Sequence, residues 1–163
     1  MEIEIVKPST RRQIADGREL NYEYIEEMGA DPLLRPYFEA QHFFADIDNM
    51  PRGYEAPDGV YLLAYVNGIA AATVAVRRLD ETTCEMKRLY VRPAFQGMGL
   101  GRLLAKRAIS EAKYLGYLRM RLDNSKSVMA KANALYASLG FYEIEPYNTN
   151  FVADAYFMEK LLV

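Results

Sequence analysis

The chain of 163 residues is long enough to bury the core of one domain, and its composition is that of an ordinary globular protein. A net charge of −2 argues against a general nucleic-acid binder, because such proteins carry a strongly basic face. One cysteine, Cys84, and one histidine, His42, exclude an intramolecular disulfide and a histidine- or cysteine-rich metal site. We therefore expect a single domain over residues 1–163 without metal, nucleic acid or membrane span, in a reducing, cytoplasmic compartment.

The beginning of the chain predicts one strand and two helices. Residues 2–6 alternate polar and apolar side chains, as a half-buried strand does. A helix follows, with Ser9 or Thr10 as its cap and Gly29 as its stop. A second helix is expected over residues 33–47.

A β-hairpin and a third strand come next. Residues 61–66 and 69–76 flank Asn67-Gly68, a dipeptide that favours a type I′ turn because both positions tolerate positive φ. Residues 84–91 continue the meander, which a proline then ends.

The second half of the chain predicts alternating helices and strands. Two helices have their apolar residues on one face, and a glycine closes each of them. In chain order, the expected elements are a helix over 98–115, a strand over 117–122, a helix over 127–139 capped by Ser127, and a pair of strands over 141–145 and 152–161.

The most informative motif lies in the middle of the chain. An apolar run ends at Pro93, and glycines then occupy every second position, at Gly97, Gly99 and Gly101, before the long helix. Glycines let backbone N–H groups turn inward, and a helix N-terminus adds free N–H groups and its positive dipole end. Residues 86–110 also carry six cations and no acid. We therefore predict a cradle for phosphate oxygens.

Other glycine motifs fit this loop less well. A P-loop requires Gly-Lys-Ser/Thr, whereas Arg102 and Leu103 follow Gly101. The dinucleotide fingerprint requires its third glycine one residue later, in a first strand–turn–helix unit. A tight turn with close helix packing remains a second interpretation of a bare Gly-x-Gly-x-Gly.

The longer string is more specific. Residues 96–101, Gln-Gly-Met-Gly-Leu-Gly, resemble the acetyl-coenzyme A signature Gln/Arg-x-x-Gly-x-Gly/Ala of the GNAT superfamily of N-acetyltransferases, without departure. Residues 133–141, Asn-Ala-Leu-Tyr-Ala-Ser-Leu-Gly-Phe, resemble the superfamily's Asn-x-x-Ala/Leu-Tyr-x-x-x-Gly-Phe segment. The resemblance implies the α/β GNAT fold, a mostly antiparallel mixed sheet of about seven strands with about four helices. It also implies that the fourth and fifth strands diverge to admit coenzyme A.

The resemblance assigns a set of residues to acetyl-CoA, the expected co-substrate. The pyrophosphate is expected on the backbone of Gln96, Gly97, Met98, Gly99, Leu100 and Gly101. At a strand bulge, the pantetheine and the acetyl carbonyl are expected to meet backbone groups of Leu89, Tyr90 and Val91.

Further cofactor contacts are expected from side chains. Arg102, Lys106 and Lys131 are candidates for phosphate contacts, or else belong to a solvated helix face. Asn133, one helical turn before Tyr136, is expected to hydrogen-bond the pantetheine arm.

Two residues are candidates for proton transfer. Tyr136 matches the tyrosine that, in many members of the superfamily, protonates or hydrogen-bonds the leaving thiolate. Glu85 lies where members with a strand glutamate place their base, often acting through a water. Alternatively, Glu85 and Lys87 form a structural ion pair, and ordered water alone removes the proton.

The acceptor site is less well specified. Tyr37, Lys87, Tyr147 and Asn148 are the candidates, since aromatic side chains can flank an amine. In the similar branch of small bacterial proteins, a threonine as a rule follows the Leu-Asp pair, but Asn124 stands here, so we assign that position no function.

The expected activity is acetyl-CoA-dependent N-acetylation of a small-molecule amine or amino-acid-like metabolite. The amine attacks directly in a ternary complex, and Cys84 takes no covalent part. Alternatives are a non-catalytic acyl-CoA sensor, a protein or peptide N-acetyltransferase, and a donor with a longer acyl chain. The resemblance also admits a homodimer, although no residue of the chain demonstrates one.

Overall fold

The computed structural model describes residues 1–40, 43–150 and 152–163, so His42 lies outside the described part. Seven strands form one sheet in the order β1-β2-β3-β4-β5-β7-β6. Their bounds are β1 Ile3–Val6, β2 Val60–Val66, β3 Ile69–Arg78, β4 Thr83–Val91, β5 Arg119–Ser125, β6 Tyr142–Glu143 and β7 Ala155–Leu161. Neighbouring strands are antiparallel except β4 and β5, which are parallel, as the predicted mixed sheet requires.

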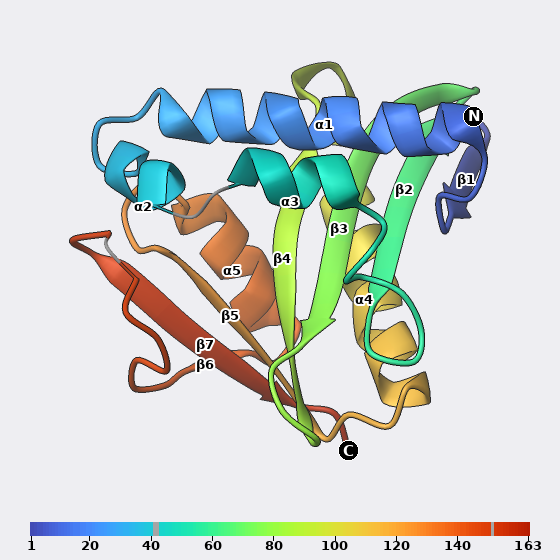
Figure 1. Ribbon diagram of the computed structural model, residues 1–163. Helices are drawn as coiled ribbons and strands as arrows, with labels where there is room; N and C mark the ends of the chain where they lie inside the picture. The colour runs from blue at the N-terminus through green and yellow to red at the C-terminus, as the bar shows by residue number, and fades with distance from the viewer. Residues whose placement is uncertain (41–42, 151) are drawn as a thin grey trace.

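Helices cover both faces of this sheet. The described residues form α1 Arg11–Gly29, α2 Arg35–Ala40, α3 Phe43–Asn49, α4 Leu100–Tyr114 and α5 Ala130–Ser138, with a 3₁₀ turn at Pro93–Phe95. Figure 1 shows α1, α2 and α3 in front of the sheet, with α4 and α5 behind it.

The helix expected over 33–47 is described in two parts, α2 and α3, and residues 41–42 between them lie outside the described part. Tyr37, Phe38, Phe43 and Ile47 all pack in one apolar cluster on the α1 side of the sheet.

The helix ends confirm the expected stop at Gly29 and one of the expected caps, and correct another cap. Thr10 caps α1 in a reciprocal capping box with Gln13, which confirms one of the two predicted caps. Gly29 is the last residue of α1, and the cap is Ala30 in a right-handed conformation. Ser127 does not cap α5, because its hydroxyl and N–H both bond the Asp154 carboxylate ahead of β7.

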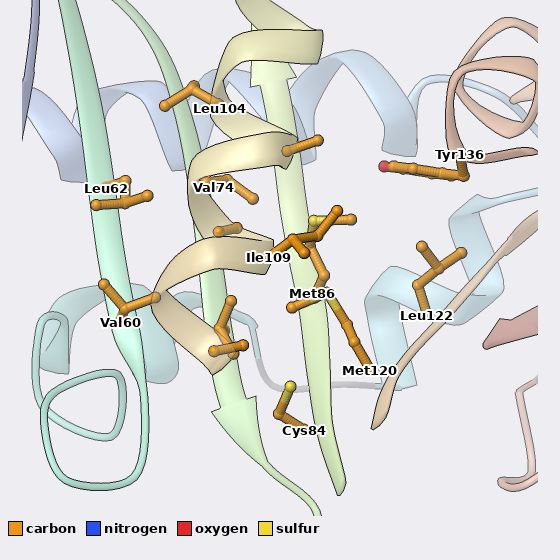
Figure 2. Close-up of a cluster of buried hydrophobic side chains, with 14 of the residues drawn as sticks. Val60, Leu62, Val74, Cys84, Met86, Leu104, Ile109, Met120, Leu122 and Tyr136 are labelled. Atoms are coloured by element: carbon orange, nitrogen blue, oxygen red, sulfur yellow. The ribbon is translucent and has the colours of Figure 1, made fainter. Parts of the chain in front are cut away.

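The main hydrophobic core lies between α4 and the sheet (Figure 2). Leu104 of α4 packs there with Leu62, Val74 and Met120 from three strands, all of them fully buried. Burying one such side chain stabilises the fold by about 1.5–3 kcal/mol. Cys84 is buried in the same core, as the sequence predicts for a small apolar side chain.

The hairpin and the strand divergence follow the predictions. Asn67 (φ 49°) and Gly68 (φ 80°) both adopt positive φ in the turn between β2 and β3. β4 pairs with β5 only at residues 83–85, opposite residues 119–121, and beyond this point the two strands separate. This divergence opens the middle of the sheet beside the second half of β4.

The strand bulge lies slightly earlier than predicted. Opposite β3, the register of β4 shifts between Lys87 and Tyr90, and Arg88 has a positive φ of 58°. The extra residue therefore falls at Arg88 and Leu89 rather than within 89–91. As a result Lys87 and Arg88, although consecutive, both approach the ring of Phe43 in front of the sheet.

Candidate active site

The glycine loop forms one wall of the site. Gly97 (φ 84°) and Gly99 (φ 81°) adopt left-handed conformations that side-chain-bearing residues rarely take. Gly99 is the N-cap of α4, and among the described residues no side chain caps this helix end. The side-chain amide of Gln96 donates to the carbonyl of Val91 at 3.1 Å, folding the loop onto the end of β4. The first N–H groups of α4 are therefore left available for an anion.

A groove of about 620 Å³ runs along this loop. Its lining brings together most of the predicted cofactor residues: Leu89, Tyr90, Val91, Gln96, Gly97, Gly99, Leu100, Gly101 and Arg102. Lys131 adds a second cation and Glu27 an acid. Met98 and Lys106 are exposed and do not belong to this lining.

A smaller cavity of about 40 Å³ lies in the gap between β4 and β5. Tyr24, Leu89 and Met129 line both this cavity and the groove, so the two spaces adjoin. The predicted residues Tyr37, Lys87 and Tyr136 also line the cavity.

Tyr136 is a buried residue of α5 at the edge of the cavity. Figure 2 shows its hydroxyl pointing away from α5 toward β4. Burial raises the pKa of Tyr136, so the hydroxyl stays protonated and available as a donor at neutral pH.

Asn133 lines neither of the two spaces. Its amide donates to the Ser125 carbonyl at 3.1 Å and accepts from the Asn124 amide at 2.8 Å. Both polar ends of Asn133 thus tie α5 to the end of β5, and its predicted contact with pantetheine stays a prediction.

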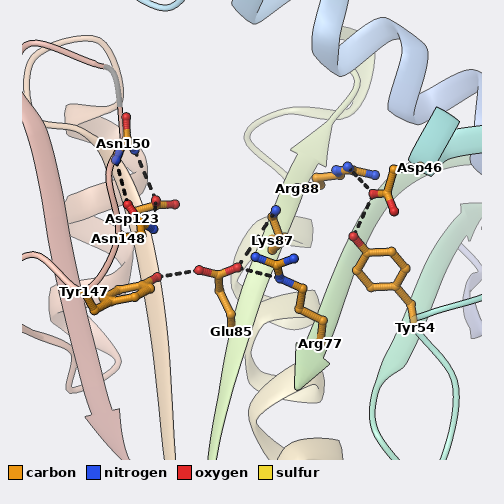
Figure 3. A network of polar contacts seen from close by, with 10 residues as sticks. All are labelled: Asp46, Tyr54, Arg77, Glu85, Lys87, Arg88, Asp123, Tyr147, Asn148 and Asn150. Atoms are coloured by element: carbon orange, nitrogen blue, oxygen red, sulfur yellow. Dashed lines mark hydrogen bonds and ion pairs between the residues drawn. The ribbon is translucent and has the colours of Figure 1, made fainter. Parts of the chain in front are cut away.

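Glu85 is the centre of a polar network on the front face of the sheet (Figure 3). One carboxylate oxygen accepts from Nε of Arg77 at 2.9 Å, and the other accepts from the Tyr147 hydroxyl at 2.6 Å. Nζ of Lys87 lies 3.9 Å from the first oxygen. Glu85 is only 2% exposed and is not in the cavity lining, so it contacts this space through its partners.

Asp123 is a site residue to which the sequence analysis assigned no function. It lines the cavity from β5, and its Oδ2 accepts from the amides of Asn148 at 2.8 Å and Asn150 at 3.1 Å. Burial, and then the charge of Glu85, raise the pKa of Asp123, while the two amides oppose this shift. Asp123 lies two residues after Arg121 and four after Arg119 on the same strand, so all three side chains belong to one polar face. This alternation is the sequence pattern that could have identified Asp123.

Arg88 is a second residue that the sequence analysis left without a role. Its guanidinium pairs with the Asp46 carboxylate of α3 at 2.5 Å and lies 4.8 Å from the centroid of the Phe43 ring. Asp46 also accepts from the Tyr54 hydroxyl. These contacts anchor α3 to the bulge of β4 and leave Lys87 beside the cavity.

The match to known proteins identifies the chain. The family model described as "Acetyltransferase (GNAT) family" matches residues 20–141, which span the glycine loop, both diverging strands and Tyr136. The chain belongs to the GNAT acetyltransferase family. An uncharacterized N-acetyltransferase of Schizosaccharomyces pombe is 36% identical over 149 residues, covering 90% of this chain and 87% of that protein.

Two further matches agree with this GNAT assignment. The N-alpha-acetyltransferase RimI of Mycobacterium tuberculosis is 31% identical over 142 residues, covering 80% of this chain and 87% of its own. The structure of the PaiA N-acetyltransferase of Thermoplasma acidophilum, in complex with coenzyme A, has a TM-score of 0.72 at 19% identity over 99% of each chain. The predicted GNAT fold is confirmed, and this GNAT protein is an acyltransferase.

The single cysteine of this GNAT acetyltransferase is buried. Burial raises the pKa of the Cys84 thiol to about 12, which disfavours a thiolate nucleophile. Residues 1–40, 43–150 and 152–163 contain no cluster of three or more acidic, histidine or cysteine side chains placed for a metal ion. Within the same described ranges, no helix combines the length and apolar character needed to cross a membrane.

Proposed function

We propose that this GNAT acetyltransferase transfers the acetyl group of acetyl-CoA to the amine of a small molecule or amino-acid-like metabolite. The observation that carries the proposal is the meeting of two spaces at the divergence of β4 and β5. A groove with the glycine loop lies on one side, and a small charged cavity lies on the other. Donor and acceptor can therefore meet in one ternary complex, which makes their encounter effectively intramolecular.

The groove suits the phosphate end of coenzyme A. The left-handed glycines leave the approach to the loop open, since a Cβ added at Gly97 or Gly99 meets no atom of the described chain within 4 Å. The free N-terminus of α4 favours an anion, and Arg102 and Lys131 add positive charge. Nη2 of Arg102 donates to Ser138 at 2.9 Å, which holds it between α4 and α5.

The second half of β4 suits the pantetheine and the acetyl carbonyl. From Met86 to Val91, the edge of β4 toward β5 has no strand partner among the described residues. Backbone N–H groups on this edge are available to the pantetheine amides and to a carbonyl oxygen that gains negative charge. When bound, acetyl-CoA supplies an acetyl thioester, whose carbonyl carbon the neutral amine attacks.

Glu85 remains our candidate base. Because neither Glu85 nor its partner Tyr147 lines the cavity, a proton reaches Glu85 through ordered water rather than by direct contact. Arg77 and Lys87 lie beside its carboxylate, at 2.9 Å and 3.9 Å from the same oxygen.

Tyr136 is our candidate donor to the leaving sulfur. As the new C–N bond forms and the C–S bond breaks, the sulfur leaves with the bonding electron pair. A protonated phenol beside it stabilises this charge by a hydrogen bond and supplies or relays the proton. The pKa of Tyr136 is raised above that of a thiol, so hydrogen bonding is favoured over complete proton transfer.

A protein or peptide N-terminus is the second candidate acceptor. The 31% identity to the N-alpha-acetyltransferase RimI favours it, whereas the acceptor cavity of about 40 Å³ favours a small amine. A non-catalytic acyl-CoA sensor would bind the donor without turnover. Acyl chains longer than acetyl require a deeper pocket for the acyl group.

Calorimetric titration with acetyl-CoA, with NAD and ATP as controls, is the first test. We expect micromolar binding of acetyl-CoA alone, followed by thiol release in a screen of small amines, amino acids and N-terminal peptides. Absence of acetyl-CoA binding contradicts the proposal. Binding without thiol release from any amine supports the sensor instead.

Two sequence predictions accompany this proposal. A single buried cysteine suits a reducing, cytoplasmic location, which fractionation of tagged protein tests. The homodimer remains a prediction, which sedimentation measurements would test.

A further inference from the structure

Some charged groups around the small cavity form close ion pairs with one another, and two others do not. Arg77 is paired with Glu85, and Arg88 is paired with Asp46. Lys87, whose ion pair with Glu85 is long at 3.9 Å, and Asp123 line the same cavity from β4 and β5 respectively. Figure 3 shows Lys87 and Asp123 on the two strands, on either side of the gap.

Both remaining groups have free hydrogen-bonding capacity. Nζ of Lys87 donates no hydrogen bond to any described residue, and its nearest carboxylate oxygen, 3.9 Å away on Glu85, already accepts from Arg77. Asp123 uses Oδ2 for both Asn148 and Asn150, and Oδ1 has no hydrogen-bond partner in the described part of the chain. Asp123 can thus accept a hydrogen bond from an ammonium group, and Lys87 can donate hydrogen bonds to a carboxylate. Both side chains face one small space.

Resting on the proposed function, we propose that this cavity recognises the zwitterionic head group of a free amino acid, with Asp123 receiving the ammonium and Lys87 the carboxylate. The volume of about 40 Å³ accommodates a small polar head group, since one water requires about 10–15 Å³ by this measure. Asn148 and Asn150 hold the Asp123 carboxylate in place, and the stack of Arg88 on Phe43 holds the wall beside Lys87.

The electrostatics of the cavity support this recognition. Burial lowers the pKa of Lys87, and burial raises the pKa of Asp123, so each charge is disfavoured in the cavity as it stands. A zwitterion brings a close opposite charge to each group at once. A peptide N-terminus brings only the ammonium, because an amide replaces its carboxylate.

The aromatic side chains of the cavity can contact the rest of the amino acid. Tyr24, Tyr37, Phe38 and Phe43 form its front wall. Phe43, Lys87 and Arg88 also border a more open hollow of about 330 Å³ beneath α3, into which a side chain can extend. The head group is thus specified by charge, and the rest of the amino acid lies between the aromatic wall and a hollow that Asp46 and Arg77 also line.

The test compares the twenty L-amino acids with their amides, using thiol release from acetyl-CoA. We expect at least one free amino acid to be acetylated with kcat/KM about tenfold or more above that of its amide, which keeps the ammonium but lacks the carboxylate. Lys87→Met should lower kcat/KM for that amino acid by about 30-fold or more and abolish its preference over the amide. Asp123→Asn should lower kcat/KM for both compounds alike.

The controls separate this inference from the proposed function. Lys113→Met removes an exposed cation at the far end of α4 and should leave both the rates and the preference unchanged. Acetyl-CoA titration of each variant shows whether it is folded and binds the donor. The inference is overturned if amides or peptides are preferred, if Lys87→Met keeps the preference, or if no amino acid is acetylated. Loss of acetyl-CoA binding by the wild type, or the absence of thiol release with amines of any kind, overturns the proposed function as well.

Discussion

The hydroxyl of Tyr147 donates a 2.6 Å hydrogen bond to Oε2 of Glu85, joining the segment between β6 and β7 to the middle of β4. The ring of Tyr147 also lies 5.4 Å from the guanidinium of Arg121, on the strand between them. The same segment carries Asn148 and Asn150, which hold Asp123. Glu85 therefore fixes the segment that orients the other buried carboxylate of the site.

Replacing Glu85 by Gln should affect both stability and turnover. Arg77 loses its charged partner, and we expect the free energy of unfolding to fall by about 1–3 kcal/mol in urea denaturation. If Glu85 is the base, kcat falls by about 10²–10⁴-fold.

Tyr147→Phe is the matched variant, because it keeps the carboxylate and removes one hydrogen bond, at a cost of about 1 kcal/mol. A Glu85→Gln enzyme with full kcat would remove the base role and leave Glu85 as a structural residue.

Tyr136→Phe should keep acetyl-CoA binding and slow turnover by about 10- to 10⁴-fold, the range expected on loss of a general acid. Steady-state kinetics and calorimetric titration on the same preparation measure both quantities. Tyr117→Phe is the control, since Tyr117 is also buried but donates to the Asp58 carbonyl, away from both cavities. Equal rates for the wild type and Tyr136→Phe would show that the hydroxyl has no part in the reaction.

Gly99→Glu should abolish acetyl-CoA binding, because it places a negative charge and a side chain in the phosphate cradle. The positive φ of Gly99 also strains any other residue there. Gly116→Glu separates the two effects, since Gly116 has a similar φ of 96° and open space around it, but lies beyond the other end of α4. Both variants should lose thermal stability, and only Gly99→Glu should lose binding. Retained binding in Gly99→Glu would leave the loop as a structural turn.

Asp123→Asn should change how stability depends on pH. In the folded protein the pKa of Asp123 is raised, so the native state keeps this proton to a higher pH than the unfolded chain, which ionises near about 3.9. Above that pH the free energy of unfolding of the wild type therefore falls as pH rises, until Asp123 ionises in the native state too. The stability of Asp123→Asn relative to wild type should rise over this window in urea denaturation.

Asp154 provides the opposite case. Hydrogen bonds from Ser127, and next from Ser125, lower its folded pKa, so its contribution to stability is present above the unfolded pKa and is lost as pH falls. Asp154→Asn should thus lose stability relative to wild type as pH rises through the same region. Identical pH dependence in both variants would contradict the assignment of the Asp123 shift to its buried site.

The sequence by itself determined the features that depend on short stretches of chain. The Asn67-Gly68 turn, the Thr10 cap and the left-handed glycines ahead of α4 each follow from the conformations that a few adjacent residues allow. The order of strands and helices followed from the apolar periodicity and from the resemblance to the GNAT superfamily. These features place the predicted phosphate cradle at the start of α4.

Only the tertiary structure decided which polar groups meet at the acceptor side. Tyr147 reaches Glu85 across 62 residues, and Arg88 reaches Asp46 across 42, pairings that no local pattern contains. The bulge at Arg88 brings its guanidinium to the ring of Phe43 on α3, a contact that no local sequence pattern contains. Asp123 is a site residue because the divergence of β4 and β5 opens a cavity beside it. Burial in that cavity, rather than its neighbours in sequence, determines its charge environment.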